Sequence, residues 1–404
     1  MIDQSTPELD GIRWPQISLE AACSLITDGT HQTPTYADEG FVFLSSKNVT
    51  SGRIDWDNVK RIPEWLHAQL HCRLSPQKGD LLLAKNGTTG VAAIVDRDDV
   101  VFDIYVSLAL LRPRPNVLPE YLHQVLNSPL AKEQFNGALK GIGVPNLHLK
   151  DIRRAVIPLP PLSEQKRIAE ILDRAEALRA KRRAALALLD ELTQSIFLDM
   201  FGDPAVNPHK FPTVQLSSLV RVNDRLNYGV VQPGDDVADG VPLVRVSDLT
   251  GGKVADSNLK RISKEIDSSY KRSRLNGDEV LISCVGTVGS IALVEESQKG
   301  FNIARAVARV PLVDTCNRVF IAEYLRSHHV QRYFTGELRT VSQPTLNIKQ
   351  IGETGIQIPP IGMQNEFEIR KVQVDHLRQR QERAALVLDE YFSSLQQRAF
   401  RGDL

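Results

Sequence analysis

The sequence lacks several features that would assign the protein to a particular class. Its 404 residues carry no net charge, with 49 basic and 49 acidic side chains, so overall charge does not indicate a polyanionic partner. The four cysteines form no CxxC pair, which indicates reduced thiols rather than a disulfide framework or a zinc ribbon. No apolar run is long enough to cross a membrane, and the first residues lack the basic and apolar regions of a signal peptide. We therefore expect a cytoplasmic protein with no membrane partner.

Motifs for catalysis are missing as well. The sequence contains no GxxxxGK[ST] phosphate loop and no GxGxxG that opens a helix after a strand. Leu159 and Ile358 precede its two Pro-Pro pairs, so neither pair belongs to the [DNS]-P-P-[FYW] tetrapeptide that amino-methyltransferases use. We therefore expect no catalytic residue and no bound cofactor in this chain.

The sequence repeats itself with a period of about 200 residues. The clearest match pairs residues 78–95, KGDLLLAKNGTTGVAAIV, with residues 276–294, NGDEVLISCVGTVGSIALV. Residues 144–150, VPNLHLK, match residues 343–349, QPTLNIK, and a Pro-Pro pair follows in each copy. A repeat this long and this consistent in order is not a solenoid, and it predicts two homologous halves.

One group of side chains has the spacing of metal ligands. His67 and His71 would share one face of a helix, with Cys72 beside them. The second copy of this segment, residues 267–271 (DSSYK), contains no histidine. A surface helix explains the pair better, and we expect no metal ion.

Each half begins with a globular part of mixed secondary structure. We expect strands at residues 81–84, 91–95 and 106–111, and helices at residues 63–71 and 119–135. Strands and helices in this arrangement favour an α+β fold over a regular βαβ alternation.

A long helix with a heptad pattern follows each globular part. In the first copy Pro160 and Pro161 precede the helix, Ser163 is a candidate N-cap, and Gly202 ends it. Apolar residues recur at alternating intervals of three and four, which is typical of a helix that packs along another helix. Arg182, Arg370 and Gln381 are polar exceptions. Arg182 and Gln381 can fix the register or the antiparallel orientation, or they can mark a seam that frays or reaches solvent. The seam consists of Ile168, Ile171, Ala175, Leu178, Ala185, Leu189, Leu192 and Ile196 in the first copy, and of Phe367, Val374, Leu377, Ala384, Leu388, Tyr391 and Leu395 in the second.

The repeat predicts four segments. Residues 1–157 and 205–357 would form two homologous globular domains, and residues 158–204 and 358–404 would form two helical spacers. Because each helix has a copy of itself as the natural partner, we expect an antiparallel coiled coil and a pseudo-twofold arrangement of the domains.

The Gly-Thr turns at residues 87–90 and 286–289 allow two interpretations. They can be tight turns between strands, or places where the backbone approaches a phosphate group. Residues 257–277 carry six basic and two acidic side chains, which favours contact with DNA, although charge runs are usually solvated faces. The motif leaves both interpretations open.

In its order of motifs, the chain resembles the specificity subunit of a type I restriction-modification system. The Gly-Thr turns, the Pro-x-Leu segments and the sequence PLPPLSEQKRIAEILD at residues 158–173 carry this resemblance over almost the whole chain. It implies a non-catalytic subunit with two target recognition domains, each reading one half of a bipartite site in double-stranded DNA. It further implies two partner methyltransferase subunits that modify adenine with S-adenosylmethionine. Two nuclease/translocase subunits, which use ATP and Mg, can join this complex. A coiled-coil scaffold that never contacts DNA is the alternative.

Two sets of contact residues follow from this resemblance. The resemblance implies that the start of each long helix binds a methyltransferase subunit. Residues 162–167 and 361–366 share only one identity, Gln165 with Gln364, so the two docking surfaces can differ. The candidates for DNA contact are Lys47, Asn48, Lys85, Asn86, Thr88, Lys140, Asn146, Arg245, Ser247, Arg274, Thr287, Arg305, Gln343 and Thr345. The candidates for methyltransferase docking are Glu164, Gln165, Lys166, Arg167, Glu170 and Gln364.

Overall fold

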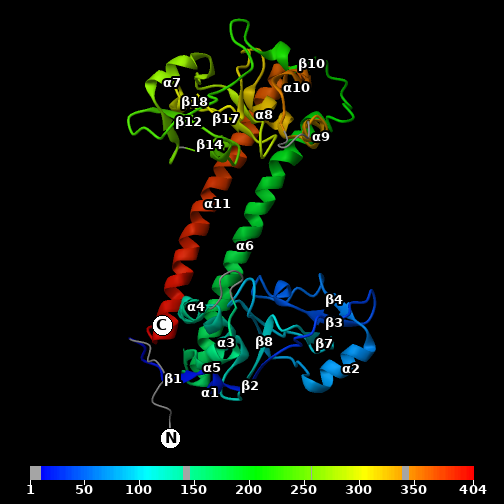
Figure 1. Cartoon of the computed structure of the whole chain (residues 1–404), viewed down its shortest axis with the longest axis vertical. Coiled ribbons are helices and arrows are strands. Elements are labelled where there is room, and N and C mark those ends of the chain that lie inside the picture. Colours follow the sequence, from blue (N-terminus) through cyan, green and yellow to red (C-terminus); the bar gives the residue numbers. More distant parts are fainter. Residues whose placement is uncertain (1–10, 140–145, 256, 339–344) are drawn as a thin grey trace. The chain divides into compact units, whose positions relative to one another are not determined.

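The structure, a computed structural model, describes residues 11–139, 146–255, 257–338 and 345–404, apart from the side chain at position 190. It divides into two compact units: residues 1–183 with 383–404 form unit 1, and residues 184–382 form unit 2. Each unit combines a globular body with segments of both long helices (Figure 1). The segments expected from the sequence are therefore grouped differently, because each helix contributes to both units.

Unit 1 contains a four-stranded antiparallel sheet in the order β2-β8-β5-β6 and a three-stranded sheet in the order β4-β3-β7. In the smaller sheet, β3 pairs antiparallel with β4 and parallel with β7, and a separate pair joins β1 to β9. The elements are β1 (Gln16–Ser18), α1 (Leu19–Ala22), β2 (Cys23–Asp28), β3 (Phe41–Leu44), η1 (Ser46–Asn48), β4 (Lys60–Ile62), α2 (Glu64–Arg73), β5 (Leu81–Ala84), β6 (Ala92–Ile94), β7 (Phe102–Ile104), β8 (Leu108–Pro113), α3 (Pro119–Leu126), α4 (Pro129–Ala138), α5 (Leu149–Arg154), β9 (Val156–Pro158) and α6 (Leu162–Phe201).

Unit 2 repeats this topology and adds two strands, β14 and β13, beside β17 in its larger sheet. Its strands β11-β19-β16-β17 correspond to β2-β8-β5-β6, and β15-β12-β18 correspond to β4-β3-β7. Even the register is kept, since Leu81 pairs with Leu111 and Val280 pairs with Val310. The elements are β10 (Thr213–Gln215), η2 (Leu216–Leu219), β11 (Asn227–Tyr228), β12 (Val241–Val244), η3 (Val246–Asp248), β13 (Leu249–Thr250), β14 (Lys253–Val254), β15 (Lys260–Ile262), α7 (Lys264–Ser269), η4 (Lys271–Ser273), β16 (Val280–Ser283), β17 (Ile291–Leu293), η5 (Glu296–Gln298), β18 (Asn302–Ile303), β19 (Val307–Val310), α8 (Arg318–Arg326), α9 (His328–Gly336), α10 (Ile348–Glu353), β20 (Gly355–Gln357) and α11 (Ile361–Arg401).

Strand β5 shows why a central strand of the sheet has an apolar residue at every position. Leu81 and Leu83 pack into a core with helices α3, α4 and α6, whereas Leu82 and Ala84 pack into a second core with β3 and β7. Successive side chains of a strand point to opposite faces, so a strand covered on both faces needs apolar residues at every position. Strand β16 is buried on both faces in the same way.

The helix expected at residues 119–135 is two helices. α3 ends at Leu126, and α4 begins at Pro129. Proline lacks the backbone N–H that a continuing helix would use, but it fits the first position of a new one. The other expected strands and helices of the first half lie close to β5, β6, β8 and α2.

The two long helices run antiparallel to one another within each unit. In unit 1, Arg167 donates a hydrogen bond to the Leu404 carbonyl, and Arg179 lies 2.6 Å from Asp389, so partner numbers fall as α6 advances. In unit 2, Phe197, near the end of α6, contacts Phe367, near the start of α11, edge to face with ring centroids 5.5 Å apart. In the part of the chain that the structure describes, none of the helices could span a membrane by its length and apolarity.

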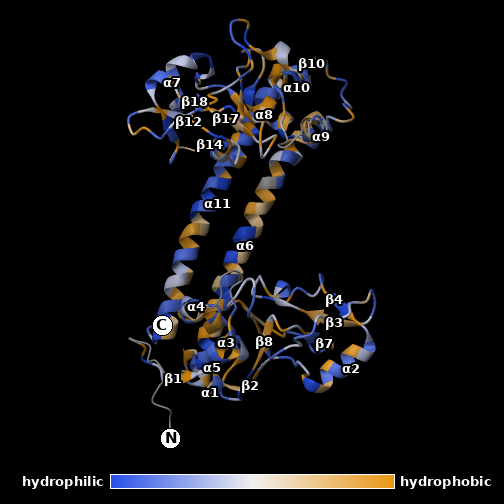
Figure 2. Ribbon diagram, viewed as in Figure 1, coloured by the Kyte–Doolittle hydropathy of each residue, from blue (hydrophilic) through white to orange (hydrophobic). Residues whose placement is uncertain are grey.

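The buried face of the helices differs from the expected heptad seam. Ile168, Phe367 and Val374 are buried as expected. Leu178, Leu192, Leu377 and Tyr391 are instead exposed, by 57%, 39%, 45% and 66%. The remaining seam residues are half-buried, and both helices alternate hydrophilic and hydrophobic patches along their length (Figure 2). The buried apolar residues of the helices outside the expected seam are Ala169, Leu172, Phe197, Phe201, Phe392, Ala399 and Phe400.

The physical reason lies at the helix ends. Leu172, Phe392 and Phe400 share a core with the globular body of unit 1, and Phe197 and Phe201 share one with that of unit 2. The heptad pattern assumes a single helical partner, but the ends have two neighbours and bury a wider face. The middle of each helix has one neighbour and leaves part of its seam in solvent. The pseudo-twofold arrangement stays a prediction.

The start of α6 differs from the predicted start, and its end agrees with the prediction. The helix begins at Leu162, so Ser163 lies inside the first turn and is not the N-cap. The N–H groups of Glu164 and Gln165 both donate to the Pro161 carbonyl. Gly202 ends the helix with φ 74°, a conformation that glycine adopts most easily.

Candidate nucleic-acid interface

The Gly-Thr turn and the Pro-x-Leu segment lie side by side in both units. In unit 1, Asn86 forms a β-bridge with Asn146, and the Leu147 N–H donates to the Lys85 carbonyl at 3.0 Å. In unit 2, Val285 bridges Thr345, and the Leu346 N–H donates to the Cys284 carbonyl at 2.9 Å. Two motifs far apart in the sequence therefore form one surface in each unit.

A third segment, which follows the first strand of the larger sheet, joins this surface. In unit 1, the Thr30 N–H donates to the Ile104 carbonyl at 3.1 Å. In unit 2, the Val230 N–H donates equivalently to the Ile303 carbonyl at 2.8 Å. The segment that follows Ile104 or Ile303 reaches the Gly-Thr turn, because the Ser107 carbonyl accepts from the Lys85 N–H and the Ala306 carbonyl from the Cys284 N–H. A Cβ atom on Gly29 would lie 1.9 Å from the Ile104 oxygen, so only glycine permits this approach. Gly229 makes the equivalent approach to Ile303 in unit 2, and neither glycine belongs to the repeated motifs of the sequence.

Several predicted contact residues are accessible on this surface. Thr88 and Thr287 are exposed at the tips of the Gly-Thr turns, and Arg305 is exposed in unit 2. Arg305 and Thr345 line a hollow of about 350 Å³ together with Tyr228, Val285, Ala306 and Asn347. Lys47 and Ser247 are exposed on the equivalent short helices η1 and η3. Asn86 and Asn146 are half-buried, and Lys140 and Gln343 lie outside the described residues.

Two predicted contacts of unit 1 are internal. Lys85 is 6% exposed, and its ammonium group lies 2.5 Å from the buried carboxylate of Asp28. Asn48 is also 6% exposed, and its side chain accepts a hydrogen bond from the Ser45 N–H and donates one to the Asn58 carbonyl. Neither side chain is available to DNA, so these two predictions are wrong.

Two predicted arginines of unit 2 are engaged in ion pairs. Arg245 pairs with Asp248 at 3.0 Å, and Arg274 donates from Nε to Asp267 at 3.0 Å. Burial would raise the pKa of Asp267, but hydrogen bonds from Arg274 and Asn302 outweigh it and lower that pKa. Both arginines hold loops in place, and their assignment as DNA contacts stays a prediction.

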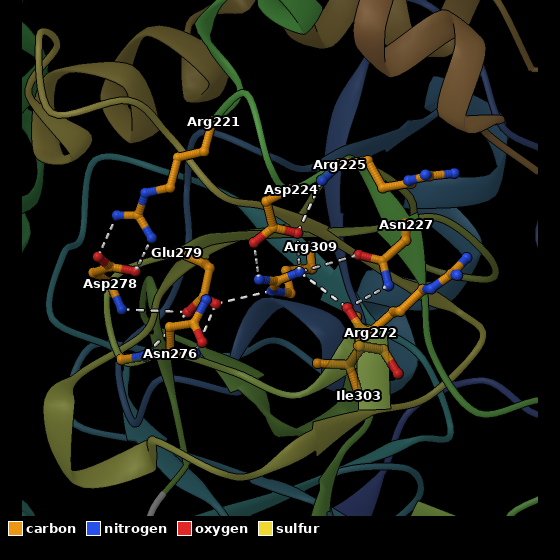
Figure 3. Close-up of polar contacts among 12 residues, drawn as sticks. Arg221, Asp224, Arg225, Asn227, Arg272, Asn276, Asp278, Glu279, Ile303 and Arg309 are labelled. Carbon is orange, nitrogen blue, oxygen red and sulfur yellow. Dashed lines mark hydrogen bonds and ion pairs between the residues drawn. The ribbon is translucent and has the colours of Figure 1, made fainter. Parts of the chain in front are cut away.

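Other cations that the sequence candidates missed are better placed. Arg309 is buried on β19 and donates to Glu279, to Asp224 and to the Arg272 carbonyl (Figure 3). Burial opposes its charge, but the bonds to Asp224 and Glu279 outweigh burial and raise the pKa of Arg309. Figure 3 shows the guanidinium groups of Arg225 and Arg272 pointing away from this acidic cluster, and both residues are exposed.

Arg225 and Arg272 flank the strand that carries Tyr228, whose side chain lines the hollow with Arg305. Three exposed guanidinium groups beside hydroxyl and amide side chains can contact phosphates and base edges. The basic run at residues 257–277 includes Arg272, but sequence alone does not show which of its basic side chains form internal ion pairs.

The structure also corrects two docking candidates. Gln165 is 1% exposed; its side chain accepts from the Leu118 N–H and donates to the carbonyls of Asn116 and Pro160. Gln364 is equally buried; it accepts from the Asn317 N–H and donates to the Pro359 carbonyl.

The glutamine shared by the two copies therefore fastens the start of each long helix to its globular body and cannot contact a partner. Lys166, Arg167 and Glu170 remain exposed, and Glu164 is half-buried in an ion pair with Arg167.

One described group of side chains has the geometry of a metal site. Within the described ranges, His67, His71 and Asp103 alone bring three potential ligand atoms within 4.8 Å of one another. Cys72, which neighbours the histidines in sequence, is exposed, and the third potential ligand is Asp103 of strand β7.

Known proteins share the sequence features of both units. A sequence profile described as the type I restriction modification DNA specificity domain matches residues 36–187 and 222–377. The EcoBI specificity subunit of a type I restriction enzyme from Escherichia coli is 31% identical, over 97% of this chain and 86% of that protein. The EcoKI specificity subunit from Escherichia coli strain K12 is 21% identical, over 91% of this chain and 83% of that protein.

Solved structures share the fold. One comes from work on the assembly and conformational transition of a type I R-M system, and it covers 98% of this chain and all of its own with a TM-score of 0.57 and 19% identity. The S subunit of a type I restriction-modification system from M. genitalium covers 98% of both chains with a TM-score of 0.56 and 14% identity. At these identities the likeness concerns the fold alone.

Proposed function

This chain belongs to the family of type I restriction-modification DNA specificity domains, and from that premise we propose that it reads a bipartite, asymmetric DNA site. A type I specificity subunit recognises DNA sequence. We assign one half-site to each unit, with the surface formed by the Gly-Thr turn, the Pro-x-Leu segment and the loop after the first strand as the reading surface.

The observation that carries this proposal is a conserved scaffold with different side chains. Both units place the same three segments together through equivalent backbone hydrogen bonds. At matching positions of the β-bridges, unit 1 has Asn86 and Asn146 where unit 2 has Val285 and Thr345. Base edges are distinguished by hydrogen-bonding and apolar side chains, so two such surfaces would read two different sequences.

Reading would combine two kinds of contact. Exposed cations such as Arg225, Arg272 and Arg305 would position unit 2 on the phosphates, and Lys47 would do so in unit 1. Side chains at the turns, such as Thr88 and Thr287, would approach the bases. We assign the spacing of the half-sites to the long helices, whose predicted seam from Ile168 to Ile196 extends about 40 Å at 1.5 Å per residue, against about 34 Å for a turn of B-DNA.

The chain would act through partners. We propose that two methyltransferase subunits dock on the exposed side of the long helices, including Lys166, Arg167 and Glu170, and methylate adenine with S-adenosylmethionine. Two nuclease/translocase subunits that use ATP and Mg can complete the restriction enzyme. The chain itself would be non-catalytic and would work in the cytoplasm, where the DNA of a prokaryotic host lies.

The test is methylation-sensitive sequencing of DNA from a host that expresses this chain with its methyltransferase. A bipartite motif is expected, and replacing residues 14–157 with those of a relative should change one half-site and leave the other unchanged. A change in both half-sites would contradict modular reading. If the assembled complex selects no sequence from a duplex library, the scaffold alternative is correct.

A further inference from the structure

A buried carboxylate and two histidines meet in unit 1 where helix α2 packs on strand β7. His67 and His71 are separated by one helical turn, which places both imidazoles on the face of α2 that covers the strand. Asp103 lies on β7 and is 2% exposed. His67 is held in place by Phe41, whose ring stacks on the imidazole at 3.7 Å.

Both imidazoles direct Nδ1 at the same carboxylate. His67 Nδ1 lies 2.7 Å from Asp103 Oδ2, and His71 Nδ1 lies 3.5 Å from Asp103 Oδ1. On its other side, His71 Nε2 lies 2.8 Å from the Ser75 hydroxyl. If Nε2 donates its proton to Ser75, the lone pair of His71 Nδ1 faces the cluster. A polar partner on the far nitrogen is the usual second-shell arrangement of a metal-binding histidine.

Two atoms of the cluster are buried without a hydrogen-bond partner. They are His71 Nδ1 and Asp103 Oδ1, which face one another across the 3.5 Å separation. Buried polar atoms nearly always have a partner, and an unpaired one costs about 1–3 kcal/mol. Both atoms can bind a cation placed between them, so the cluster offers two further ligand atoms.

In the equivalent pocket of unit 2, an arginine balances the charge of a buried carboxylate. Asn302 occupies the strand position of Asp103, and Asp267 occupies the helix position of His67. The carboxylate of Asp267 receives hydrogen bonds from Asn302 at 2.9 Å and from Arg274 at 3.0 Å. Unit 1 keeps a carboxylate in this pocket, but Arg73, whose neighbour Leu74 packs in a core equivalent to that of Leu275, donates to the Asp28 carbonyl at 3.2 Å instead. The balancing charge must therefore come from elsewhere.

We propose that unit 1 binds a divalent transition-metal ion of the Zn²⁺ type through His67 Nδ1, His71 Nδ1 and the carboxylate of Asp103. Imidazole and carboxylate ligands suit Zn²⁺, and three protein ligands leave a fourth position for water. The ion takes the place of the proton that the hydrogen bond between His67 and Asp103 requires, so binding releases a proton.

The ion would brace the reading surface of unit 1 and not that of unit 2. Asp103 is followed by Ile104, whose carbonyl accepts the Thr30 N–H, and by Tyr105, whose N–H donates to Leu44. Linking α2 to β7 would therefore stiffen the strand from which this surface extends. The inference rests on the geometry of the cluster and does not require the proposed DNA site.

The experiment titrates the purified full chain, freed of metal by a chelator, with Zn²⁺ and separately with Co²⁺. The H67Q/H71Q variant should lose one equivalent of tightly bound metal and the visible absorption of the cobalt form. The matched control is H328Q/H329Q, which removes two exposed histidines of α9 and should bind as the wild type does. Zn²⁺ should raise the melting temperature of the wild type and of the control, and leave that of H67Q/H71Q unchanged.

Two further variants keep the test decisive if H67Q/H71Q fails to fold. D103N introduces the residue that unit 2 carries at this position, and H71Q leaves the bond between His67 and Asp103 intact. Each should lower zinc affinity by more than the about 10- to 100-fold typical of losing a second-shell partner. Equal zinc affinity in the wild type, D103N and H71Q would overturn the proposal and leave a protonated His67 as the partner of Asp103. Sequence-specific methylation by the complex is read out separately, so failure of one idea does not imply failure of the other.

Discussion

Replacing Gln165 by alanine should destabilise unit 1 without touching a docking surface. The side-chain amide of Gln165 makes three hydrogen bonds with the backbone at the junction of α6 and the globular body. At about 1 kcal/mol for each lost bond, the free energy of unfolding should fall by about 3 kcal/mol. Gln364 makes two hydrogen bonds of this kind in unit 2, so Q364A should cost about 2 kcal/mol.

The sequence offers a convenient assay for this prediction. All three tryptophans, Trp14, Trp56 and Trp65, lie in unit 1, so their fluorescence follows the unfolding of that unit. In urea, Q165A should shift the tryptophan transition to lower concentration, and Q364A should act mainly on the transition seen by circular dichroism.

The control for Q165A is K166A, because Lys166 is exposed beside it and its loss should change stability by less than about 0.5 kcal/mol. If Q165A unfolds as the wild type does but no longer binds the methyltransferase, the reasoning is refuted and Gln165 is a docking residue after all.

Three further outcomes are expected. K85M leaves the buried carboxylate of Asp28 without its close ammonium partner and should cost about 3 kcal/mol, measured by tryptophan fluorescence in urea; a loss below about 1 kcal/mol would contradict it. The pKa of Asp267 is lowered in the folded state, so the stability that this carboxylate contributes is present above about pH 4 and is lost as pH falls through the lowered pKa. D267N should therefore flatten this part of the curve of unfolding free energy against pH. An unchanged curve would count against the ion pair. R305A should reduce the salt dependence of DNA binding by about one unit of the logarithmic slope, while K299A, at an exposed lysine paired with Glu296, should not; equal slopes would remove Arg305 from the interface.

Much of the architecture follows from local signals in the sequence. The two Pro-Pro pairs and Gly202 predict the long helices, which extend over Leu162–Phe201 and Ile361–Arg401. The apolar run at residues 81–84 predicts β5 within its observed bounds. The repeat predicts two bodies of the same fold, and four strands of the larger sheet and three of the smaller sheet have the same order in both units. Turn chemistry, helix ends and repetition are local properties, so a linear reading detects them.

The candidate interface could be predicted only in part. The Gly-Thr and Pro-x-Leu motifs mark the segments that meet, but residue type alone does not show which side chains are free. Lys85 and Thr88 are three positions apart in one turn, yet Lys85 is committed to Asp28 and Thr88 is exposed. Arg272 and Arg274 differ in the same way, because Arg274 pairs with a buried carboxylate.

The sequence by itself determined the duplication, the helix bounds, the strand-rich bodies and the family. Only the tertiary structure decided that each long helix is shared between the two units, that Gln165 is an internal fastening, and that Asp103 joins His67 and His71. The physical reason is that repeats, caps and periodicity are written in neighbouring residues. Burial and pairing depend on residues that are distant in the chain and meet only when the sheets and helices pack.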